Sequence, residues 1–407
     1  MSYTLTADQQ TAYSAIVDLV TSNQTELVLL GGAGVGKTTL VKAFIDEWPT
    51  ICQLSAGALK DMPVVLTATT NKAADALSMA TGRETKTIHS ALGLRVENKG
   101  FRKTEIVDNQ ISLQSGVLYI VDESSFVDTE LLKHIRGKAK MTNSKVVYLG
   151  DHCQLKPVGS KDTPVFNAGI KTVELNEIVR QADSSPIKQL SLDLRAYVDG
   201  GPMPRINIDG VSLIHMDKEN FIKSLIADCQ SGQSTRALSW TNERAKEYNR
   251  YVIEALKGRA DIGAGDELTV NKQVQLRGVY KLPTDSTVRV VSVGEYKKDR
   301  NNIQSREVEI STGYILKQAL NQWEVDGLIK DAYACDEKKK AYMIENHYVD
   351  LRLAYASTVN KAQGSTYDNV YIDLNDIGKC YDKDQVRRML YVALSRARHK
   401  AVFTGDI

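Results

Sequence analysis

The segment Gly31–Thr39 constrains the fold of this chain more than any other part of its sequence. It reads GGAGVGKTT and matches G-x-x-x-x-G-K-[ST] in full. It follows Glu26–Leu30, an apolar run that predicts a buried strand, and leads into a helical pattern over Thr38–Trp48 that Pro49 is expected to end. In that setting glycines let successive backbone N–H groups face one anion at a helix N-terminus. The segment therefore predicts a phosphate-binding loop within an α/β fold.

Strand and helix patterns alternate on both sides of this loop. Helical spacing covers 8–22 and 71–79, and short buried strands are predicted over 64–67, 117–121 and 145–149. A second region of the same kind is indicated by a strand at 237–240, a helix at 242–256 and a strand at 370–373. Such alternation is typical of parallel sheets covered by helices.

Two stretches interrupt the alternation. Residues 93–115 predict a small hairpin that turns at Asn98–Gly100. Residues 265–350 hold short β-type runs and then a charged helical stretch around Glu337–Lys340, which favours a small β-barrel-like insertion. Because single cores stop growing near about 250–300 residues, a chain of 407 residues is expected to form two or more domains.

Composition excludes several classes of protein. Lys and Arg number 52 against 50 Asp and Glu, a net charge of +2, so any nucleic acid must bind where positive charge is gathered in one groove. The 5 cysteines are far apart, which argues against a disulfide framework or a zinc finger. There is no signal-peptide pattern, and no apolar run approaches the roughly 18–20 residues of a membrane helix. We expect a soluble, cytoplasmic protein with no membrane partner.

Several candidate catalytic residues lie in or near the predicted loop. Lys37 is expected to reach the β- and γ-phosphates, and the Thr38 hydroxyl to ligate Mg²⁺. Asp122 closes a buried strand and is suited to hold the same ion, while Glu123 can orient and deprotonate an attacking water. Gln154 lies in a loop that follows the next strand and can hydrogen-bond a γ-phosphate oxygen or that water. These residues favour hydrolysis of a nucleoside triphosphate.

Several blocks in this order resemble the motifs of superfamily 1 helicases, in the RecD-like group and close to its bacteriophage members. The blocks are Leu5–Gln9, Gly31–Thr39, Leu66–Ala74, Thr87–Ser90, Asp122–Ser125, Gly150–Val158, Leu175–Gln181, Ser357–Thr366 and Tyr391–Arg398. The chain departs from the family's usual pattern at Thr69 and at Asn360, both in blocks that contact the nucleic-acid strand in that family.

The resemblance implies an α/β fold with two RecA-like P-loop NTPase domains. The first would carry a β-hairpin insertion, or pin, and the second an SH3-like β-barrel insertion. The implied boundaries are 1–92 and 116–180 for the first domain (1A), 93–115 for its insertion (1B), 181–264 and 351–407 for the second domain (2A), and 265–350 for its insertion (2B).

The resemblance also implies a set of site residues. Gln9 would read adenine, and the nucleotide would contact Gly31, Gly32, Ala33, Gly34, Val35, Gly36, Lys37, Thr38, Thr39, Gln363 and Gly364. Arg180 and Arg396 would act as arginine fingers, because a planar guanidinium stabilises the charge that develops on the γ-phosphate. The strand contacts would be Thr69, Thr70, Asn71, His89, Phe101, Thr358 and Asn360. Phe101 could stack on a base at the fork, or it could anchor the hairpin to its own domain.

The implied function is that of an ATP-dependent DNA helicase that moves 5′→3′ on single-stranded DNA, separates duplexes and strips bound proteins. Its partners would be single-stranded and forked DNA, with a single-strand-binding protein or other replication and recombination proteins, in the bacterial host cytoplasm if the chain is phage-encoded. Three alternatives stay open from the residues: an RNA helicase, a translocase without strand separation, and a P-loop switch that recruits protein partners.

Overall fold

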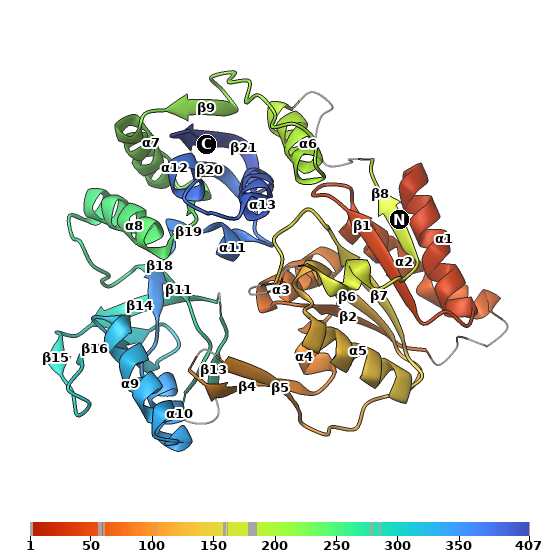
Figure 1. Cartoon of the computed structure of the whole chain (residues 1–407), viewed down its shortest axis with the longest axis horizontal. Helices are drawn as coiled ribbons and strands as arrows, with labels where there is room; N and C mark the ends of the chain where they lie inside the picture. The colour runs from red at the N-terminus through yellow and green to blue at the C-terminus, as the bar shows by residue number, and fades with distance from the viewer. Residues whose placement is uncertain are drawn as a thin grey trace. The chain divides into compact units, whose positions relative to one another are not determined.

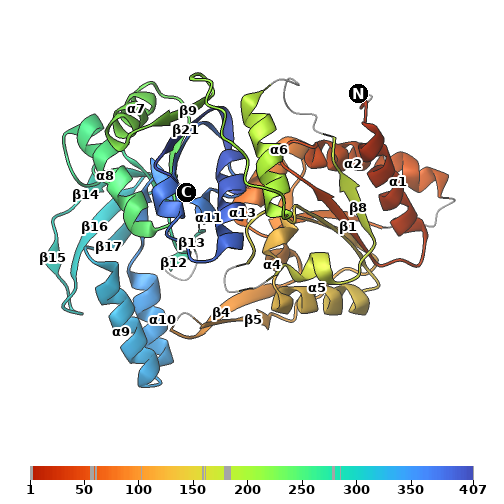
Figure 2. The ribbon, with the colours of Figure 1, turned by 45° about the horizontal axis from the view of Figure 1, so that its top comes forward.

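The computed structural model describes residues 3–55, 59, 62–101, 103–157, 160, 162–177, 185–276, 280–284 and 286–406. The chain divides into two compact units, whose elements are labelled in Figures 1 and 2. Unit 1 comprises Met1–Arg95, Ile106–Asp209 and Asp382–Ser395, and unit 2 comprises Val96–Glu105, Gly210–Tyr381 and Arg396–Ile407.

Unit 1 is built on a parallel sheet with the strand order β3-β2-β6-β7-β1-β8. Its strands are β1 (Glu26–Gly31), β2 (Val64–Ala68), β3 (Thr85–Thr87), β6 (Leu118–Asp122), β7 (Lys145–Gly150) and β8 (Thr172–Leu175). Its helices are α1 (Ala7–Thr21), α2 (Lys37–Leu54), α3 (Asn71–Thr81), α4 (Ile88–Ala91), α5 (Thr129–Met141), α6 (Pro186–Val198) and α13 (Lys383–Leu394), with 3₁₀ turns at Ser124–Phe126 and Pro164–Asn167.

Both faces of this sheet are buried, because side chains alternate along each strand. In β1, Leu27 and Leu29 pack in one core with residues of α1 and α2, whereas Val28 and Leu30 pack in a second core with residues of α4 and α5. The strands therefore read as continuous apolar runs, as expected for a sheet covered on both sides.

Unit 2 contains a second parallel sheet, with the order β19-β10-β20-β21-β9. Its elements are β9 (Leu213–Met216), α7 (Lys218–Gln230), β10 (Thr235–Ser239), α8 (Asn242–Lys257), β19 (Ala356–Thr358), α11 (Val359–Ala362), β20 (Tyr367–Asp373), α12 (Leu374–Ile377) and β21 (Ala397–Thr404). Phe221 of α7 and Tyr248 of α8 pack with Tyr371 of β20, so these two helices cover the same face.

An antiparallel region is inserted into unit 2 between α8 and β19. Its strands are β11 (Glu267–Val270), β12 (Val274–Leu276), β13 (Tyr280–Leu282), β14 (Thr287–Val293), β15 (Lys297–Lys298), β16 (Gln304–Ile310), β17 (Ile315–Ala319) and β18 (Leu351–Leu353). The main sheet has the order β15-β16-β14-β11-β18, with β17 paired to β16. Two helices, α9 (Gln322–Ala334) and α10 (Lys338–His347), stand between β17 and β18 in sequence and pack on each other.

The segment predicted to be a hairpin forms the two-stranded sheet β4 (Leu94–Gly100) and β5 (Lys103–Asp108). The predicted turn at Asn98–Gly100 is wrong, because β4 continues through Gly100 and the turn follows it. In both views the end of this sheet lies beside α10, where Asn98 donates a hydrogen bond to Glu345. A glycine favours a turn, but strand pairing and the contact with Glu345 keep Gly100 as the last residue of β4.

The predicted end, at Pro49, of the helix that follows the phosphate loop is also wrong. Helix α2 runs from Lys37 to Leu54 with Pro49 inside it. A proline within a helix loses one backbone hydrogen bond and clashes with the carbonyl four residues earlier, at a cost of about 3 kcal/mol. Residues on both sides of it, Trp48 and Ile51, pack against the core of unit 1, and this burial offsets the cost.

The parallel α/β organisation in two parts, predicted from the alternation of strands and helices, is confirmed. Across the part of the chain that the structure describes, no helix is both long enough and apolar enough to cross a membrane.

Replacing Pro49 by alanine should stabilise unit 1 by about 1–3 kcal/mol, because the helix regains a hydrogen bond and loses the clash. We expect the thermal midpoint to rise by about 2–4 °C for each kcal/mol, measured by calorimetry. The control is Pro186→Ala at the first turn of α6, where proline is well tolerated. An unchanged or lower midpoint for Pro49→Ala would show that the proline is not strained.

Candidate nucleotide site

The loop after β1 has the backbone of a phosphate cradle. Gly34 and Gly36 have φ values of +86° and +78°, in the left-handed region that favours glycine. Helix α2 begins directly at Lys37, and Gly36 at its N-cap makes no side-chain cap. The first N–H groups of α2 are therefore directed to the loop, and these donors and the helix dipole favour an anion there.

Two side chains brace this loop. The Lys37 ammonium donates to the carbonyl oxygens of Gly31, at 2.5 Å, and of Gly32, at 3.1 Å. The buried Gln9 amide nitrogen donates to the Val35 carbonyl at 3.1 Å. Gln9 thus contacts the loop for which the sequence predicted a nucleotide-binding role, and its predicted role as the adenine reader stays a prediction.

The carboxylate pair lies at the same edge of the sheet, at the end of β6. Burial raises the pKa of Asp122, and the nearby charge of Lys37 opposes that rise. The Glu123 backbone adopts a φ of +51° and donates its N–H to Asp122 at 2.8 Å. The Thr69 hydroxyl donates to the Glu123 carbonyl at 3.0 Å. The structure therefore brings Lys37, Asp122 and Glu123 to the same edge of the sheet, and their catalytic roles stay predictions.

The loop after β7 is held by two residues of α13 to which the motifs assign no role. Arg388 donates to the carbonyls of His152 and of Gln154, the latter at 2.9 Å. Tyr391 donates its hydroxyl proton to the Asp151 carboxylate at 2.6 Å. Arg388 lies just before the last matched block, and Tyr391 is its first residue. This position in the sequence was the only signal that could have indicated a role at the site. Gln154 itself is buried and accepts from the Ser125 hydroxyl at 3.2 Å.

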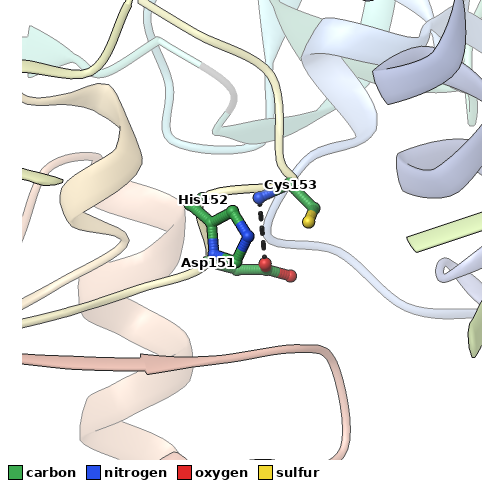
Figure 3. A group of neighbouring side chains, drawn as sticks. All are labelled: Asp151, His152 and Cys153. Carbon is green, nitrogen blue, oxygen red and sulfur yellow. Dashed lines mark hydrogen bonds between the residues drawn. The ribbon is translucent and has the colours of Figure 1, made fainter. Parts of the chain in front are cut away.

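Asp151, His152 and Cys153 bring three possible metal-ligand atoms within 4.8 Å of one another (Figure 3). The Cys153 N–H donates to Asp151 at 3.1 Å, and the Cys153 thiol and His152 both contact the Asp199 carboxylate. Burial, together with the neighbouring carboxylates, raises the pKa of Cys153 and disfavours the thiolate that a metal requires. We interpret this cluster as a hydrogen-bonded support for the loop and assign no metal to it.

The predicted strand contacts of unit 1 have local structural roles as well. Thr70 caps α3 by accepting from the Ala73 N–H at 3.2 Å, and Asn71 begins that helix with its side chain exposed. Burial lowers the pKa of His89, and the nearby His134 adds to this, while Asp128 opposes it. The His89 ring is therefore neutral near pH 7 and able to contact a strand without adding charge.

The remaining predicted residues belong to unit 2. Thr358 ends β19, Asn360 lies in α11, and Gln363 and Gly364 follow that helix. Arg396 is buried and donates to the Ser365 carbonyl at 3.1 Å. Arg180, the other predicted arginine finger, lies outside the described residues, as does most of its block.

Phe101, the proposed pin residue, is half-buried. It packs against the apolar cluster formed by Ile303 and residues of α9 and α10. Within unit 2, this contact and the hydrogen bond from Asn98 to Glu345 attach the end of the hairpin to the two helices. These helices lie within residues 265–350, the implied insertion of the second domain, so the contact differs from the expected anchor on the hairpin's own domain. A role of Phe101 at the fork stays a prediction.

A parallel sheet with a phosphate loop after its first strand and an acidic pair at the end of a neighbouring strand defines a P-loop NTPase. Comparison with known families agrees with this class. A model described as an AAA domain matches residues 4–200, and a model of the UvrD-like helicase C-terminal domain matches residues 353–404.

Known helicases match nearly the whole chain. The ATP-dependent RecD2 DNA helicase of Deinococcus radiodurans is 26% identical over 390 residues, which are 93% of this chain and 47% of that protein. The ATP-dependent DNA helicase dda of Enterobacteria phage T4 is 22% identical, over 98% of this chain and 99% of that protein. A solved Pif1 structure, of helicases unwinding forked duplex DNA, has a fold that superposes with a TM-score of 0.51 at 20% identity, covering 100% of this chain and 93% of that one. The chain belongs to the superfamily 1 helicases, in the RecD-like and Pif1-like group.

The loop geometry predicts that Gly36→Ala weakens nucleotide binding by about tenfold or more. A left-handed backbone costs a non-glycine residue about 1–2 kcal/mol, and the added Cβ would collide with the Gln9 amide. The measurement is nucleotide affinity by calorimetry.

The matched control is Gly258→Ala, which caps α8 with a φ of +64° and has nothing within 4 Å of its added Cβ. It should lower stability by a similar amount without changing nucleotide affinity. Equal affinities for the two variants would contradict a role for Gly36 in the site.

Proposed function

We propose that the chain is an ATP-dependent DNA helicase that moves 5′→3′ on single-stranded DNA, unwinds duplexes and displaces bound proteins. The proposal depends mainly on one observation: the phosphate loop and the Asp122–Glu123 pair lie at the same edge of a parallel sheet. The RecD2 and dda relatives, both named as DNA helicases, support DNA as the polymer. Forked and single-stranded DNA are the proposed partners, with replication or recombination proteins, in the cytoplasm.

The residues present fit ATP with Mg²⁺. The glycine backbone and Lys37 would bind the phosphates, while the Thr38 hydroxyl and the Asp122 carboxylate would hold the ion. Oxygen ligands are those that Mg²⁺ prefers, and Asp122 at the sheet edge carries a raised pKa that a nearby cation would lower. When bound, Mg²⁺ supplies positive charge to the phosphate oxygens.

The other residues have proposed roles in hydrolysis. Glu123 would accept a proton from the attacking water, and Gln154 would orient that water. Arg180 and Arg396 would stabilise the charge on the γ-phosphate.

We propose the implied domain scheme, 1A, 1B, 2A and 2B, with the boundaries given above. The antiparallel sheet around the apolar cluster of Leu268, Val290 and Val308 supports an SH3-like barrel in 2B. The β4–β5 hairpin would serve as the pin. Thr69 to Asn71, His89, Thr358 and Asn360 are the proposed strand contacts.

Lys37→Ala should abolish ATP binding and hydrolysis, since it removes the cation of the loop. Glu123→Gln should keep ATP binding while hydrolysis falls by about 10²-fold or more, the usual loss of a general base. Phosphate release and nucleotide affinity measure the two effects. Glu219→Gln, an exposed residue of α7, is the control and should behave as the wild type. Near-normal turnover of Glu123→Gln would show that the water is activated elsewhere.

One assay separates the helicase from its alternatives. Single-stranded DNA should stimulate hydrolysis, and a duplex with a 5′ tail should be unwound while a 3′-tailed duplex is not. Stimulation by RNA alone would favour an RNA helicase. Stimulation by DNA without unwinding would indicate a translocase, and hydrolysis that ignores both polymers would indicate a protein-recruiting switch.

Phe101→Ala should severely reduce duplex unwinding and leave DNA-stimulated hydrolysis nearly intact. Stacking on a base contributes roughly 1–3 kcal/mol, comparable to the ~1.4 kcal/mol of stacking per base-pair step. Val96→Ala, an exposed apolar residue on the same hairpin, is the control. If hydrolysis, unwinding and thermal midpoint fall in proportion, Phe101 is only an anchor for the hairpin.

A further inference from the structure

Arg195, in α6, lies directly against the first half of the phosphate loop. A Cβ atom added to Gly32 would lie 3.4 Å from both Cδ and Nε of Arg195. The side chain can approach the loop backbone this closely because Gly32 has no side chain of its own. The predicted motifs do not include Arg195, which lies beyond the block that ends at Gln181.

The guanidinium of Arg195 is incompletely satisfied. Its side chain is 18% exposed, and a carboxylate oxygen of Asp151 is 3.7 Å from Nε, beyond hydrogen-bond distance. Among the residues that the structure describes, no acceptor bonds the buried Nε–H. Buried polar groups in proteins are nearly always hydrogen-bonded, and an unpaired N–H on a cation is a donor suited to an anionic ligand.

The neighbouring Tyr391 marks where an acceptor oxygen fits. Its buried hydroxyl accepts the Ala33 N–H of the loop at 3.3 Å while it donates to Asp151. A Cβ atom on Gly32 would lie 3.1 Å from this same hydroxyl. An oxygen of a bound phosphate could take the Ala33 N–H in its place, because the amide is a donor to any nearby acceptor.

This end of the loop also faces the Lys37 ammonium, which bonds the carbonyls of Gly31 and Gly32. In a loop of this sequence the lysine reaches the β- and γ-phosphates. Arg195 and Lys37 therefore both lie beside Gly32, and we place the terminal phosphate at this end of the loop. A planar guanidinium can donate two parallel N–H bonds to one phosphate, whereas the Lys37 ammonium acts as a compact point charge.

We propose that Arg195 binds the terminal phosphate of the nucleoside triphosphate held by the loop. This rests on the proposed function, since it assigns a further binding residue to the same site. Arg195 would distinguish a triphosphate from a diphosphate, because its donors have an acceptor at the loop only when the terminal phosphate is present.

The test compares affinities of the full chain for ADP and for the slowly hydrolysed triphosphate ATPγS, by calorimetry. Arg195→Ala should weaken ATPγS binding by about tenfold or more and ADP binding by less than about twofold. Arg195→Lys should recover part of the lost ATPγS affinity, because lysine keeps the positive charge but lacks the planar pair of N–H donors of the guanidinium. It also provides a folded variant if the alanine variant does not fold.

The control is Arg244→Ala, in α8 of unit 2, whose side chain is 19% exposed and already paired with Glu247 and Asp373. It should lower the thermal midpoint and leave both affinities unchanged, whereas Arg195→Ala should change the affinity far more than the midpoint. Equal losses for ADP and ATPγS, or unchanged affinity for both, would overturn the proposal.

The wild type and Lys37→Ala separate this proposal from the function on which it rests. If the wild type binds neither nucleotide, the proposed function fails. If the wild type binds both, Lys37→Ala loses both and Arg195→Ala equals the wild type, only the role of Arg195 fails.

Discussion

The parallel pairing of the strands in unit 1 is the constraint on which the candidate site depends. Every adjacent pair in the order β3-β2-β6-β7-β1-β8 is parallel, so the carboxyl ends of all these strands lie along one edge. The phosphate loop, the Asp122–Glu123 pair and the loop that begins at Asp151 follow three of these strands. Residues far apart in sequence therefore meet at one edge, as ligands do in open α/β sheets.

A buried hydrogen-bond network connects this edge to a distant part of the chain. Tyr391 of α13 contacts both the Ala33 amide and the Asp151 carboxylate, across more than two hundred residues of sequence. Arg388 of the same helix holds two carbonyls of the loop after β7. Low exposure strengthens such contacts and makes an unpaired member costly, so α13 helps to fix the position of both loops.

Phe101 of the hairpin has two possible interpretations, stacking on a base or packing against the protein. An exposed phenylalanine at a turn suits stacking on a base, whereas the Phe101 ring packs beside α9 and α10. The hydrogen bond between Asn98 and Glu345 adds a second attachment. These two contacts fix the end of the hairpin to α9 and α10.

Local sequence alone determined the phosphate loop, the strands near 26–30, 64–67, 117–121, 145–149, 237–240 and 370–373, and the helices near 8–22, 71–79 and 242–256. The apolar run Glu26–Leu30, the glycines after it and Lys37 act over a few residues, where backbone sterics and side-chain period decide the outcome. The order of the blocks also identified the family and the acidic pair Asp122–Glu123 without any coordinates.

Only the tertiary structure decided features that depend on partners far away in sequence. Helix α2 passes through Pro49 because the residues around it are buried against the core, which outweighs the local penalty. Phe101 is held by helices more than two hundred residues later. Arg195 lies outside every matched block, and Tyr391 opens the last block without a role assigned to it. Their position beside Gly32 follows from how α6 and α13 pack. Tertiary packing places such residues next to one another although they are far apart in sequence. Local sequence patterns carry no information about these long-range contacts.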